Sequence, residues 1–387
     1  MGEAQRAGPA PPVGRRAEAV VDLDAISHNV AALRAHVGGR DLMAIVKADG
    51  YGHGLAESAR AARAGGASWL GVAFLDEALQ LRRAGDTGPL LSWLAVPGEP
   101  YEDAMDAGVE VGAYSVEQLA EIAAAAGRRG GSVAVQLKVD SGLGRGGASP
   151  EDWPRLVAAA KVHQNAGLLR VTGVWSHLAR SDEPGHPTTA AQADAFKAAV
   201  AVATEAGLEP EHLHLANSGG ALAAPETWCT MVRPGIAAFG LSPLENGASP
   251  VSLRPAMTLR SRLALVKEVP AGHGVSYGHT YVTPAATTLG LVPLGYADGV
   301  PRHASGGGPV VIRGRRLTVA GRVCMDQFVV DLGDLPASRG DEVVLFGDPA
   351  TGVPSAADWA AAAGTIDYEI VTRIGARVPR RYVGRAS

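Results

Sequence analysis

An apolar run followed by a helical stretch repeats along the first two thirds of the chain. The stretches between the runs have the spacing of amphipathic helices, as in Leu75–Ala84, Val116–Ala126, Trp153–Asn165 and Ala190–Ala206. Strands that alternate with helices pair in parallel, and eight such units are typical of a closed (β/α)8 barrel of the TIM type. The predicted strands are Leu42–Val46, Trp69–Ala73, Leu90–Leu94, Val109–Ala113, Val133–Val139, Leu169–Trp175, Glu211–Leu215 and Met231–Phe239.

The pattern changes near Arg254-Pro255. Beyond this point, short alternating runs separated by turn residues predict a mainly β domain, which ends in a helical stretch at Ile366–Ala376. For the 387 residues we therefore expect a disordered tail at 1–18, a barrel at 19–254 and a mainly β domain at 255–387. The run Ala19–Leu23 could pair with either domain. The predicted β runs are Thr258–Val269, Thr288–Pro293, Val310–Ile312, Leu317–Val330 and Glu342–Phe346.

The composition excludes several classes of function. A formal net charge of -4 gives no electrostatic basis for binding nucleic acid or an anionic membrane, and no apolar run is long enough to span a bilayer. Two cysteines, Cys229 and Cys324, form no disulfide framework and suit a reducing cytosol. The N-terminus lacks the apolar stretch of a secretory signal, so we expect a cytoplasmic protein. The histidines show no metal-ligand spacing, and the glycines at 142–147 lack the strand-to-helix setting of a dinucleotide site.

Polar and charged residues follow the predicted barrel strands. In a barrel, the carboxyl ends of all strands meet at one face, where active sites lie. Six groups in the same register therefore predict one functional site at the barrel mouth. These groups contain Lys47 after the first strand, Lys138, Asp140 and Arg145 at the fifth, His177 after the sixth, Asn217 and Ser218 after the seventh, and Arg233, Gly235 and Ile236 in the eighth.

Lys47 stands at the end of an apolar strand and before a loop with three glycines. A lysine that is partly desolvated has a lowered pKa and can act as a nucleophile, for instance by forming a Schiff base with an aldehyde cofactor. The alternative is an ordinary surface lysine at a strand end, which is what most lysines are. Residues on the opposite side of the mouth are needed to decide between these two interpretations.

The loops after the seventh and eighth strands have the features of a phosphate site. Barrels often bind phosphate there, with a hydroxyl such as that of Ser218 and the backbone N–H groups of Gly235 and Ile236 around the anion. The alternative is that these glycines only shape turns. A phosphate site on one side of the mouth and a lysine on the other match a site for pyridoxal phosphate.

A set of motifs resembles the alanine racemase family. They occur in the family's order over nearly the whole chain, and the one difference noted is Asp49-Gly50, where many members carry Asn-Ala. The resemblance implies a homodimer with one pyridoxal phosphate per chain on Lys47, and it implies sites completed by the partner's β domain. The motifs are 46–54 (VKADGYGHG), 138–145 (KVDSGLGR), Asn217-Ser218, 231–236 (MVRPGI), 276–278 (SYG), 295–299 (GYADG) and 324–326 (CMD).

The resemblance also implies a two-base mechanism that interconverts L-alanine and D-alanine through an aldimine of the cofactor. Lys47 serves one face of the substrate, and Tyr277 of the partner subunit serves the other. His177 and Arg233 stand behind Tyr277, where positive charge favours the phenolate. Arg233 also faces the pyridine nitrogen, and because arginine stays protonated it leaves this nitrogen without a proton. Without the resemblance, Tyr277 is better interpreted as an aromatic anchor and His177 equally well as a structural histidine.

The family pattern assigns further roles. Arg145 and the backbone N–H of Met325 lie near the substrate carboxylate, and Lys138 is carbamylated, so that it pairs with Arg145. A bare lysine buried beside Arg145 would be repelled. Tyr51 and Tyr368 contact the phosphate and narrow the pocket to a methyl group. Tyr296, Arg302 and Asp182 resemble residues at the entrance. A role in supplying D-alanine to the bacterial wall follows as an expectation.

Three rival interpretations remain. Pyridoxal decarboxylases for diaminopimelate or ornithine share the barrel-plus-β plan and use a cysteine that Cys324 could mimic, but they place a glutamate where this chain has Arg233. Non-catalytic pyridoxal phosphate carriers have a barrel without the second domain that here contains Tyr277. A racemase of broader substrate range is disfavoured only by the tyrosines around the pocket.

Overall fold

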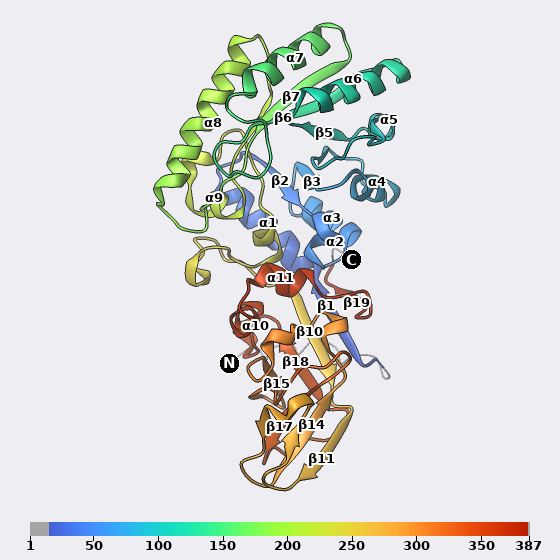
Figure 1. Ribbon diagram of the computed structural model, residues 1–387, viewed down its shortest axis with the longest axis vertical. Helices are drawn as coiled ribbons and strands as arrows, with labels where there is room; N and C mark the ends of the chain where they lie inside the picture. Colours follow the sequence, from blue (N-terminus) through green and yellow to red (C-terminus); the bar gives the residue numbers. More distant parts are fainter. Residues whose placement is uncertain (1–14, 386–387) are drawn as a thin grey trace. The chain divides into compact units, whose positions relative to one another are not determined.

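The computed structural model describes residues 15–385, which form two compact units. One unit holds residues 22–256 and 382–385, and the other holds residues 15–21 and 257–381. The first unit is a closed barrel of parallel strands with helices outside it, so the predicted (β/α)8 barrel is confirmed (Figure 1). Its strands are β2 (Asp41–Ile45), β3 (Trp69–Val72), β4 (Leu90–Ser92), β5 (Glu110–Ala113), β6 (Val133–Lys138), β7 (Leu169–Trp175), β8 (His212–His214) and β9 (Met231–Val232).

The helices of this unit cover the outside of the barrel with amphipathic faces. Helix α6 (Val116–Arg129) is representative, because Ser115 caps its start by accepting the N–H of Gln118 and Gly130 ends it in a left-handed conformation. Its buried face includes Leu119 and Ile122. The other helices are α1 (Leu23–His36), α2 (Lys47–Tyr51), α3 (Leu55–Ala64), α4 (Leu75–Arg83), α5 (Tyr101–Asp106), α7 (Trp153–Asn165), α8 (Pro187–Glu205) and α9 (Ser218–Ala223).

The eighth barrel strand is much shorter than the sequence pattern indicates. The apolar run Met231–Phe239 forms only the two residues of β9, followed by a 3-10 helix at Ile236–Phe239. Pro234 has no N–H to donate, which ends the regular pairing of the strand. The predicted site residues Gly235 and Ile236 therefore lie in the connection after the strand, as expected for ligand-binding positions in a barrel.

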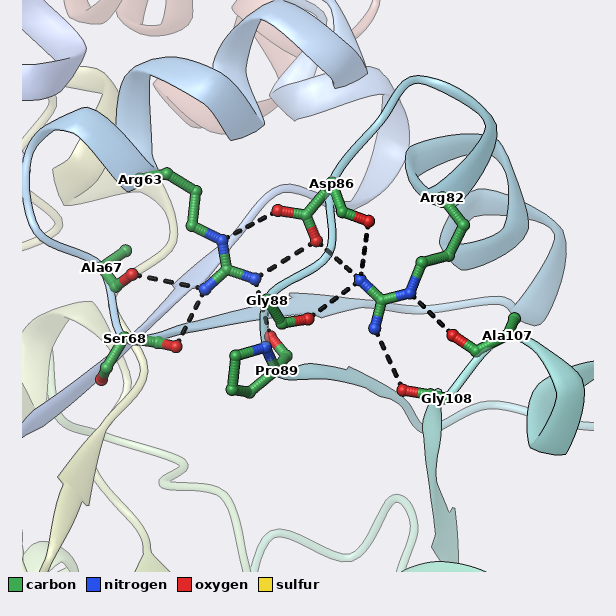
Figure 2. Close-up of polar contacts among 9 residues, drawn as sticks. All are labelled: Arg63, Ala67, Ser68, Arg82, Asp86, Gly88, Pro89, Ala107 and Gly108. Atoms are coloured by element: carbon green, nitrogen blue, oxygen red, sulfur yellow. Dashed lines mark hydrogen bonds and ion pairs between the residues drawn. The ribbon is translucent and has the colours of Figure 1, made fainter.

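At the base of the barrel, two arginines share one aspartate (Figure 2). Arg63 donates to Asp86 at 2.9 Å and to the carbonyls of Ser68 and Pro89, both at 2.8 Å. Arg82 donates to the other oxygen of Asp86 at 2.8 Å. The acceptors lie in the connections that precede β3 and β4, so this network fixes the ends of adjacent strands opposite the mouth.

Arg82 extends the same network to β5. It donates to the carbonyls of Gly88, Ala107 and Gly108 at 2.8 to 3.0 Å. Every donor group of these two side chains therefore faces an oxygen, and the side chains of Arg63, Arg82 and Asp86 are mostly buried. A buried charge is stable only when it is paired and hydrogen-bonded in this way.

The second unit is mainly β, as predicted. A six-stranded sheet has the order β16-β15-β18-β10-β1-β19, a three-stranded sheet the order β11-β14-β17, and β12 pairs with β13. The elements are β1 (Ala17–Asp22), β10 (Met257–Arg262), β11 (Leu265–Val269), β12 (Gly274–Val275), β13 (Tyr281–Val282), β14 (Thr287–Val292), β15 (Pro309–Ile312), β16 (Arg315–Thr318), β17 (Phe328–Gly333), β18 (Glu342–Phe346), α10 (Ala356–Ala363), α11 (Asp367–Thr372) and β19 (Arg380–Val383).

The first strand settles which domain the run Ala19–Leu23 joins. β1 pairs antiparallel with β10, with Ala19 opposite Leu259, so this segment belongs to the β unit. The predicted boundaries differ here, because the barrel unit begins at residue 22 and also contains residues 382–385, whereas residues 15–21 belong to the β unit. Of the predicted tail at 1–18, residues 1–14 lie outside the described residues, whereas Ala17 and Glu18 form part of β1. The described helices contain none that is both long and apolar enough to cross a bilayer.

Candidate active site

The predicted barrel residues converge on the mouth because each follows the carboxyl end of a parallel strand. Lys47 follows β2, and Lys138 is the last residue of β6. Arg145 comes from a loop folded around Asp140, whose carboxylate accepts the N–H groups of Gly142, Leu143 and Gly144 at 2.9 Å. The remaining residues follow the last three strands and are His177, Asn217, Ser218, Arg233, Gly235 and Ile236.

The backbone after Lys47 turns in the left-handed sense for five consecutive residues. Positive φ angles of 52 to 80° occur from Ala48 to Gly52, and three of these residues are not glycine. Left-handed backbone costs an L-residue about 1–2 kcal/mol. The turn is held on its far side by Asp49, whose Oδ1 accepts the N–H of Leu55 at 2.8 Å. Such strain persists only where surrounding contacts maintain it, and it is concentrated at functional sites.

Two lysines at the mouth are held where their charge is unfavourable. Burial lowers the pKa of Lys47, Arg145 lowers it further, and Glu77 acts in the opposite direction. Burial also lowers the pKa of Lys138 to about 8, together with the charges of Arg233 and Arg145. The Nζ atom of Lys138 lies 4.6 Å from the centre of the Trp175 ring. Both amines therefore lose their proton more readily than an exposed lysine.

Arg233 is a buried cation surrounded by neutral acceptors. It donates to the carbonyls of Ser176 at 2.6 Å, His214 at 2.7 Å and Leu215 at 3.3 Å. It also contacts the Nδ1 atoms of His214 at 2.9 Å and His177 at 3.4 Å. Arg233 forms no ion pair within the described part of the chain. Burial lowers its pKa, yet five acceptors keep the guanidinium protonated at neutral pH.

A chain of hydrogen bonds inside the barrel determines which atom of each group donates. The Glu110 carboxylate only accepts, so the amide nitrogen of Gln136 must face it, at 2.8 Å. The amide oxygen of Gln136 then faces His214 Nε2 at 2.6 Å, and this nitrogen carries the proton. His214 Nδ1 is therefore the acceptor for Arg233. Thr172 donates to the same oxygen of Glu110 at 2.6 Å and fixes its position.

Both histidines of the site are neutral at physiological pH. Burial holds the pKa of His177 well below its usual range, and Arg233 acts in the same direction. The same two causes lower the pKa of His214. Since Nδ1 of His177 faces the Arg233 donor, the ring proton of His177 belongs on Nε2. His177 thus presents an N–H donor on its side away from Arg233.

The predicted phosphate residues pack together. Ser218 Oγ accepts the N–H of Gly235 at 2.8 Å and that of Ala237 at 3.3 Å. A Cβ on Gly235 would lie 2.2 Å from the hydroxyl of Tyr51, so only glycine fits there. Asn217 caps α9 by accepting the N–H of Gly220 at 3.1 Å. The N–H of Gly235 therefore points at Ser218 in this structure, whereas the sequence predicts that it donates to an anion.

Comparison with known proteins decides the family. Residues 21–243 match the family described as alanine racemase, N-terminal domain, and residues 256–382 match alanine racemase, C-terminal domain. The chain belongs to the alanine racemase family. It is thus similar to isomerases and is an enzyme of that class, which confirms the resemblance found in the sequence motifs.

Individual relatives support the same assignment over the full length of the chain. Alanine racemase of Frankia casuarinae is 54% identical over 381 residues, which cover 98% of this chain and 99% of that protein. The protein of the same name from Streptomyces coelicolor is 55% identical over 375 residues, with 95% and 96% covered. A crystal structure of alanine racemase from D-cycloserine-producing Streptomyces lavendulae has a TM-score of 0.95 at 53% identity, and the match covers 96% of this chain and 98% of that one.

Three further residues of the alanine racemase pattern meet within the β unit. Tyr277 begins a short 3-10 turn after Ser276, whose hydroxyl contacts Cys324 Sγ at 3.3 Å. The N–H of Tyr296 donates to the carbonyl of Cys324 at 3.0 Å, next to Met325. Tyr277 is 73% exposed and Met325 is 53% exposed. One segment around Cys324 therefore connects these residues, and it presents two large side chains to solvent.

The other predicted residues are more scattered. Tyr368 is half-buried on α11, and Arg302 is exposed in another part of the same unit. Asp182 is exposed in the loop between β7 and α8, where its carbonyl accepts the N–H of Glu245.

Sequence reasoning missed four residues that shape the mouth. His214, Gln136 and Glu110 form the chain that orients Arg233, and Glu77 contacts the turn after Lys47. A signal existed for three of them, because a histidine, a glutamine and a glutamate stand in predicted barrel strands where apolar residues are usual. Glu77 had no comparable signal, since it looks like an ordinary acidic residue in the first turn of a helix.

Proposed function

We propose that this chain interconverts L-alanine and D-alanine by a two-base mechanism, with pyridoxal phosphate on Lys47 and with Lys47 and Tyr277 as the bases. The single observation that carries this proposal is the placement of Lys47. A half-buried amine with a lowered pKa extends from a strained turn beside Arg145, at the same mouth as the buried Arg233. An aldehyde cofactor requires a nucleophilic amine of this kind.

The residues on the other side of the mouth suit a phosphate. Ser218 Oγ already accepts two backbone N–H groups, so its own proton is available for donation to an anion. Burial raises the pKa of Tyr51, so its phenol stays protonated and is a donor as well. Both hydroxyls adjoin Gly235, where a side chain would fill the space. Together with Asn217 and the N–H of Ile236, these groups would hold the phosphate, and Tyr368 is the further phosphate contact that we assign from the family pattern.

Arg233 suits the pyridine end of the cofactor. Its guanidinium has no acceptor atom, and its orientation is set by His214 and Ser176. Because Arg233 can only donate, it would leave a ring nitrogen placed against it without a proton. Bound pyridoxal phosphate withdraws electrons from the substrate Cα and makes its proton removable. By leaving the ring nitrogen unprotonated, Arg233 would weaken this electron withdrawal and favour return of the proton to Cα over side reactions.

The two bases hold and move protons on opposite faces of the substrate Cα. The lowered pKa of Lys47 makes its amine a competent base on one face. On the other face we place Tyr277 of the partner subunit, with His177 donating its Nε2 proton to the phenol oxygen and Arg233 behind it. The high exposure of Tyr277 supports a role at the surface of another subunit. The protein would then be a homodimer with shared sites.

The substrate carboxylate would be held by Arg145 and by the backbone N–H of the partner's Met325. Lys138 supports this arrangement if it is carbamylated. The nitrogen of its neutral amine forms a bond to the carbon of CO2, keeps one hydrogen and releases the other as a proton, and the product carries a carboxylate. The pKa of about 8 leaves a usable fraction of neutral amine for that step. The resulting anion would pair with Arg145 instead of repelling it. Tyr296, Arg302 and Asp182 would line the entrance.

Two features support a cytoplasmic role in supplying D-alanine. Cys229 and Cys324 are both free thiols, which suits a reducing compartment. The mouth carries positive groups for an anionic cofactor and a carboxylate substrate, and the overall charge of -4 gives no attraction for nucleic acid or an anionic membrane.

A mixing experiment tests the shared site. A Lys47→Ala dimer and a Tyr277→Phe dimer should each be nearly inactive, because every site lacks one base. If the two are mixed so that subunits exchange, hybrid dimers contain one site with both bases intact. Racemisation should then return to about a quarter of the wild-type rate, since half the dimers are hybrids with one good site each.

The outcome separates the alternatives. If Tyr277 serves the site of its own chain, every site in the mixture keeps one defect and mixing restores nothing. No recovery despite demonstrated subunit exchange would contradict the shared site. Borohydride reduction of the wild type followed by peptide mapping should mark Lys47, and a label on another lysine would contradict the assignment of the cofactor lysine.

A further inference from the structure

One carboxylate connects the turn that carries Lys47 to the neighbouring strand–helix connection. Glu77 lies in the first turn of α4 and is half-buried. Its Oε1 atom accepts the backbone N–H of Ala48 at 2.6 Å. Its Oε2 atom accepts the N–H groups of Ala73 at 3.0 Å and Phe74 at 3.2 Å. Both oxygens are therefore engaged by backbone donors, and one donor belongs to the residue that follows Lys47.

The turn needs support on this side. Its left-handed residues begin at Ala48, directly after Lys47, and such backbone relaxes toward ordinary conformations when its contacts are removed. Asp49 holds the far side through the N–H of Leu55. On the near side, the hydrogen bond from Ala48 to Glu77 fixes the peptide unit that joins Lys47 to the turn. A rotation of that peptide would change the direction in which the Lys47 side chain leaves the barrel.

Helix α6 shows what capping alone requires. Gln118 occupies the third helical position there, as Glu77 does in α4, and its amide oxygen reaches back to the N–H of Tyr114 at 3.1 Å. The amide nitrogen of Gln118 donates to the carbonyl of Gly112. A neutral amide thus suffices for a barrel helix. At position 77, both terminal atoms face N–H donors, so an amide would satisfy one set and repel the other.

The charge of Glu77 acts on the same lysine. Burial and Arg145 lower the pKa of Lys47, and Glu77 is the nearby group that opposes them. Removal of this charge should therefore move the pKa of Lys47 further down, while loss of the hydrogen bond frees the turn. These two effects are measured independently of each other.

We propose that Glu77 is a positioning residue for Lys47. By holding Ala48 with one oxygen and the connection between β3 and α4 with the other, it maintains the left-handed turn and the direction of the Lys47 side chain. This inference rests on the proposed role of Lys47 as the cofactor lysine. Glu77 itself acts on neither substrate nor cofactor directly; it acts through Lys47.

The first test measures the turn directly in the full-length protein. Hydrogen exchange of the amides at 48–52 is compared between wild type, Glu77→Gln and Glu117→Gln. Glu117 is the matched control, because it is an exposed acidic residue in the first turn of α6 and loses the same charge without touching the turn. Exchange should rise at least about tenfold in Glu77→Gln and stay unchanged in the control. Unchanged exchange in Glu77→Gln would overturn the proposal.

The second test measures Lys47. Bound aldehyde is first removed with hydroxylamine, and Lys47 is then labelled with a limiting amount of an amine-reactive compound at a series of pH values. The pH at which the labelling rate is half-maximal (the midpoint) should fall in Glu77→Gln but not in Glu117→Gln. The turnover number should fall about tenfold with little change in KM, because substrate contacts are kept. Glu77→Asp, which keeps the charge but is too short to reach both connections, should keep the midpoint near wild type and still show raised exchange.

These readouts separate this inference from the proposed function. If the wild type does not racemise alanine, the function fails, whereas exchange and labelling still decide whether Glu77 positions Lys47. If exchange rises in Glu77→Gln but neither the midpoint nor turnover moves, Glu77 is only a structural brace and the proposal is wrong. If Glu77→Gln does not fold, Glu77→Asp supplies the same comparison.

Discussion

At the base of the barrel, Arg63 and Arg82 share Asp86 and a set of carbonyls, whereas at the mouth four cations stand close together without a carboxylate partner. The four are Lys47, Lys138, Arg145 and Arg233, and none forms an ion pair with another described residue. The turn at the mouth is also left-handed over five residues, while the connections at the base show no comparable run. The same scaffold thus pairs its cations with a carboxylate at one end and leaves its cations without an ion pair at the other.

The difference indicates which end evolved for binding. Three of the four cations, Lys47, Lys138 and Arg233, are buried or half-buried. Cations that are withdrawn from water without an ion pair destabilise the folded chain, and a protein keeps them where a ligand compensates. The base needs no ligand, because its carboxylate and carbonyls already accept every donor. The mouth is suited to anions such as a phosphate and a carboxylate, which fits the proposed cofactor and substrate.

The base should therefore respond to mutation in stability and not in activity. Asp86→Ala leaves two mostly buried guanidinium groups without their shared carboxylate, which should lower the free energy of unfolding by about 3–5 kcal/mol. Asp106→Ala is the control, because Asp106 pairs with Arg129 at the surface, where an ion pair contributes about 0–1 kcal/mol. Denaturant unfolding measures both. Equal effects of the two substitutions, or a loss of turnover per folded Asp86→Ala molecule, would contradict the contrast between the two ends.

The mouth should show the opposite behaviour, and Lys138 makes this measurable through pH. Its pKa is about 8 in the folded chain and 10.5 in the unfolded chain. Between these two values the unfolded chain binds more protons, so this lysine makes stability rise with pH. Below pH 8 both states are protonated and the full cost of burying the charge remains, about 3 kcal/mol at most. In CO2-free buffer, Lys138→Met should therefore be more stable than wild type at pH 7.

The pH dependence and the CO2 dependence check this expectation. The stability gap between Lys138→Met and wild type should narrow as pH rises from 8 to 10.5. Added bicarbonate should narrow it at pH 7, because carbamylation removes the positive charge of the wild-type side chain. If this difference in the free energy of unfolding does not change with pH, the charge of Lys138 does not destabilise the folded chain. If it does not change with bicarbonate, Lys138 is not carbamylated.

The fold could be predicted from the sequence because its signal is repeated. Eight apolar runs alternate with helical stretches, and seven of them correspond to barrel strands of three or more residues, with Leu169–Trp175 matching β7 to the residue. The eighth run was predicted as too long a strand, because apolar character alone does not show that Pro234 ends the pairing. The first strand was left open since its partner, β10, lies more than 230 residues away and local pattern carries no information on such pairing.

The candidate site was predictable residue by residue only where a motif contained it. Lys47, Ser218 and Arg233 lie in short motifs, and the structure brings them to one mouth. The supporting contacts were not predictable, because they join residues from different strands: Gln136 meets His214 across 78 positions of sequence. The direction of the Gly235 N–H also depends on a neighbour, Ser218, and not on the loop's own sequence. Long-range partners and donor directions are properties of packing.

The smallest effect of a substitution is expected in the chain of hydrogen bonds that runs from the base of the barrel to the mouth. Glu110 lies at the start of β5, on the side of the base, and through Gln136 and His214 it fixes the acceptor atom that faces Arg233 at the mouth. Glu110→Gln keeps the shape of the side chain and its capacity for hydrogen bonds. It replaces a carboxylate, which can only accept hydrogen bonds, with an amide, which can also donate them. The amide of residue 110 can then face Gln136 in either orientation, so the proton of His214 is no longer confined to Nε2.

A proton on Nδ1 of His214 would point at the Arg233 donor and repel it, so a fraction of the molecules would hold Arg233 out of place. We expect turnover to fall by about threefold to tenfold, with KM and stability close to wild type. Nitrogen chemical shifts of the His214 ring should report one tautomer in the wild type and a mixture in Glu110→Gln. Arg170 approaches both Glu110, at 3.6 Å, and Glu211, at 3.8 Å. Glu211→Gln is therefore the matched control, because it weakens the same ion pair but lies outside the hydrogen-bonded chain. If Glu110→Gln shows a single tautomer and wild-type turnover, the base does not set the state of the mouth, and the two ends of the barrel are independent.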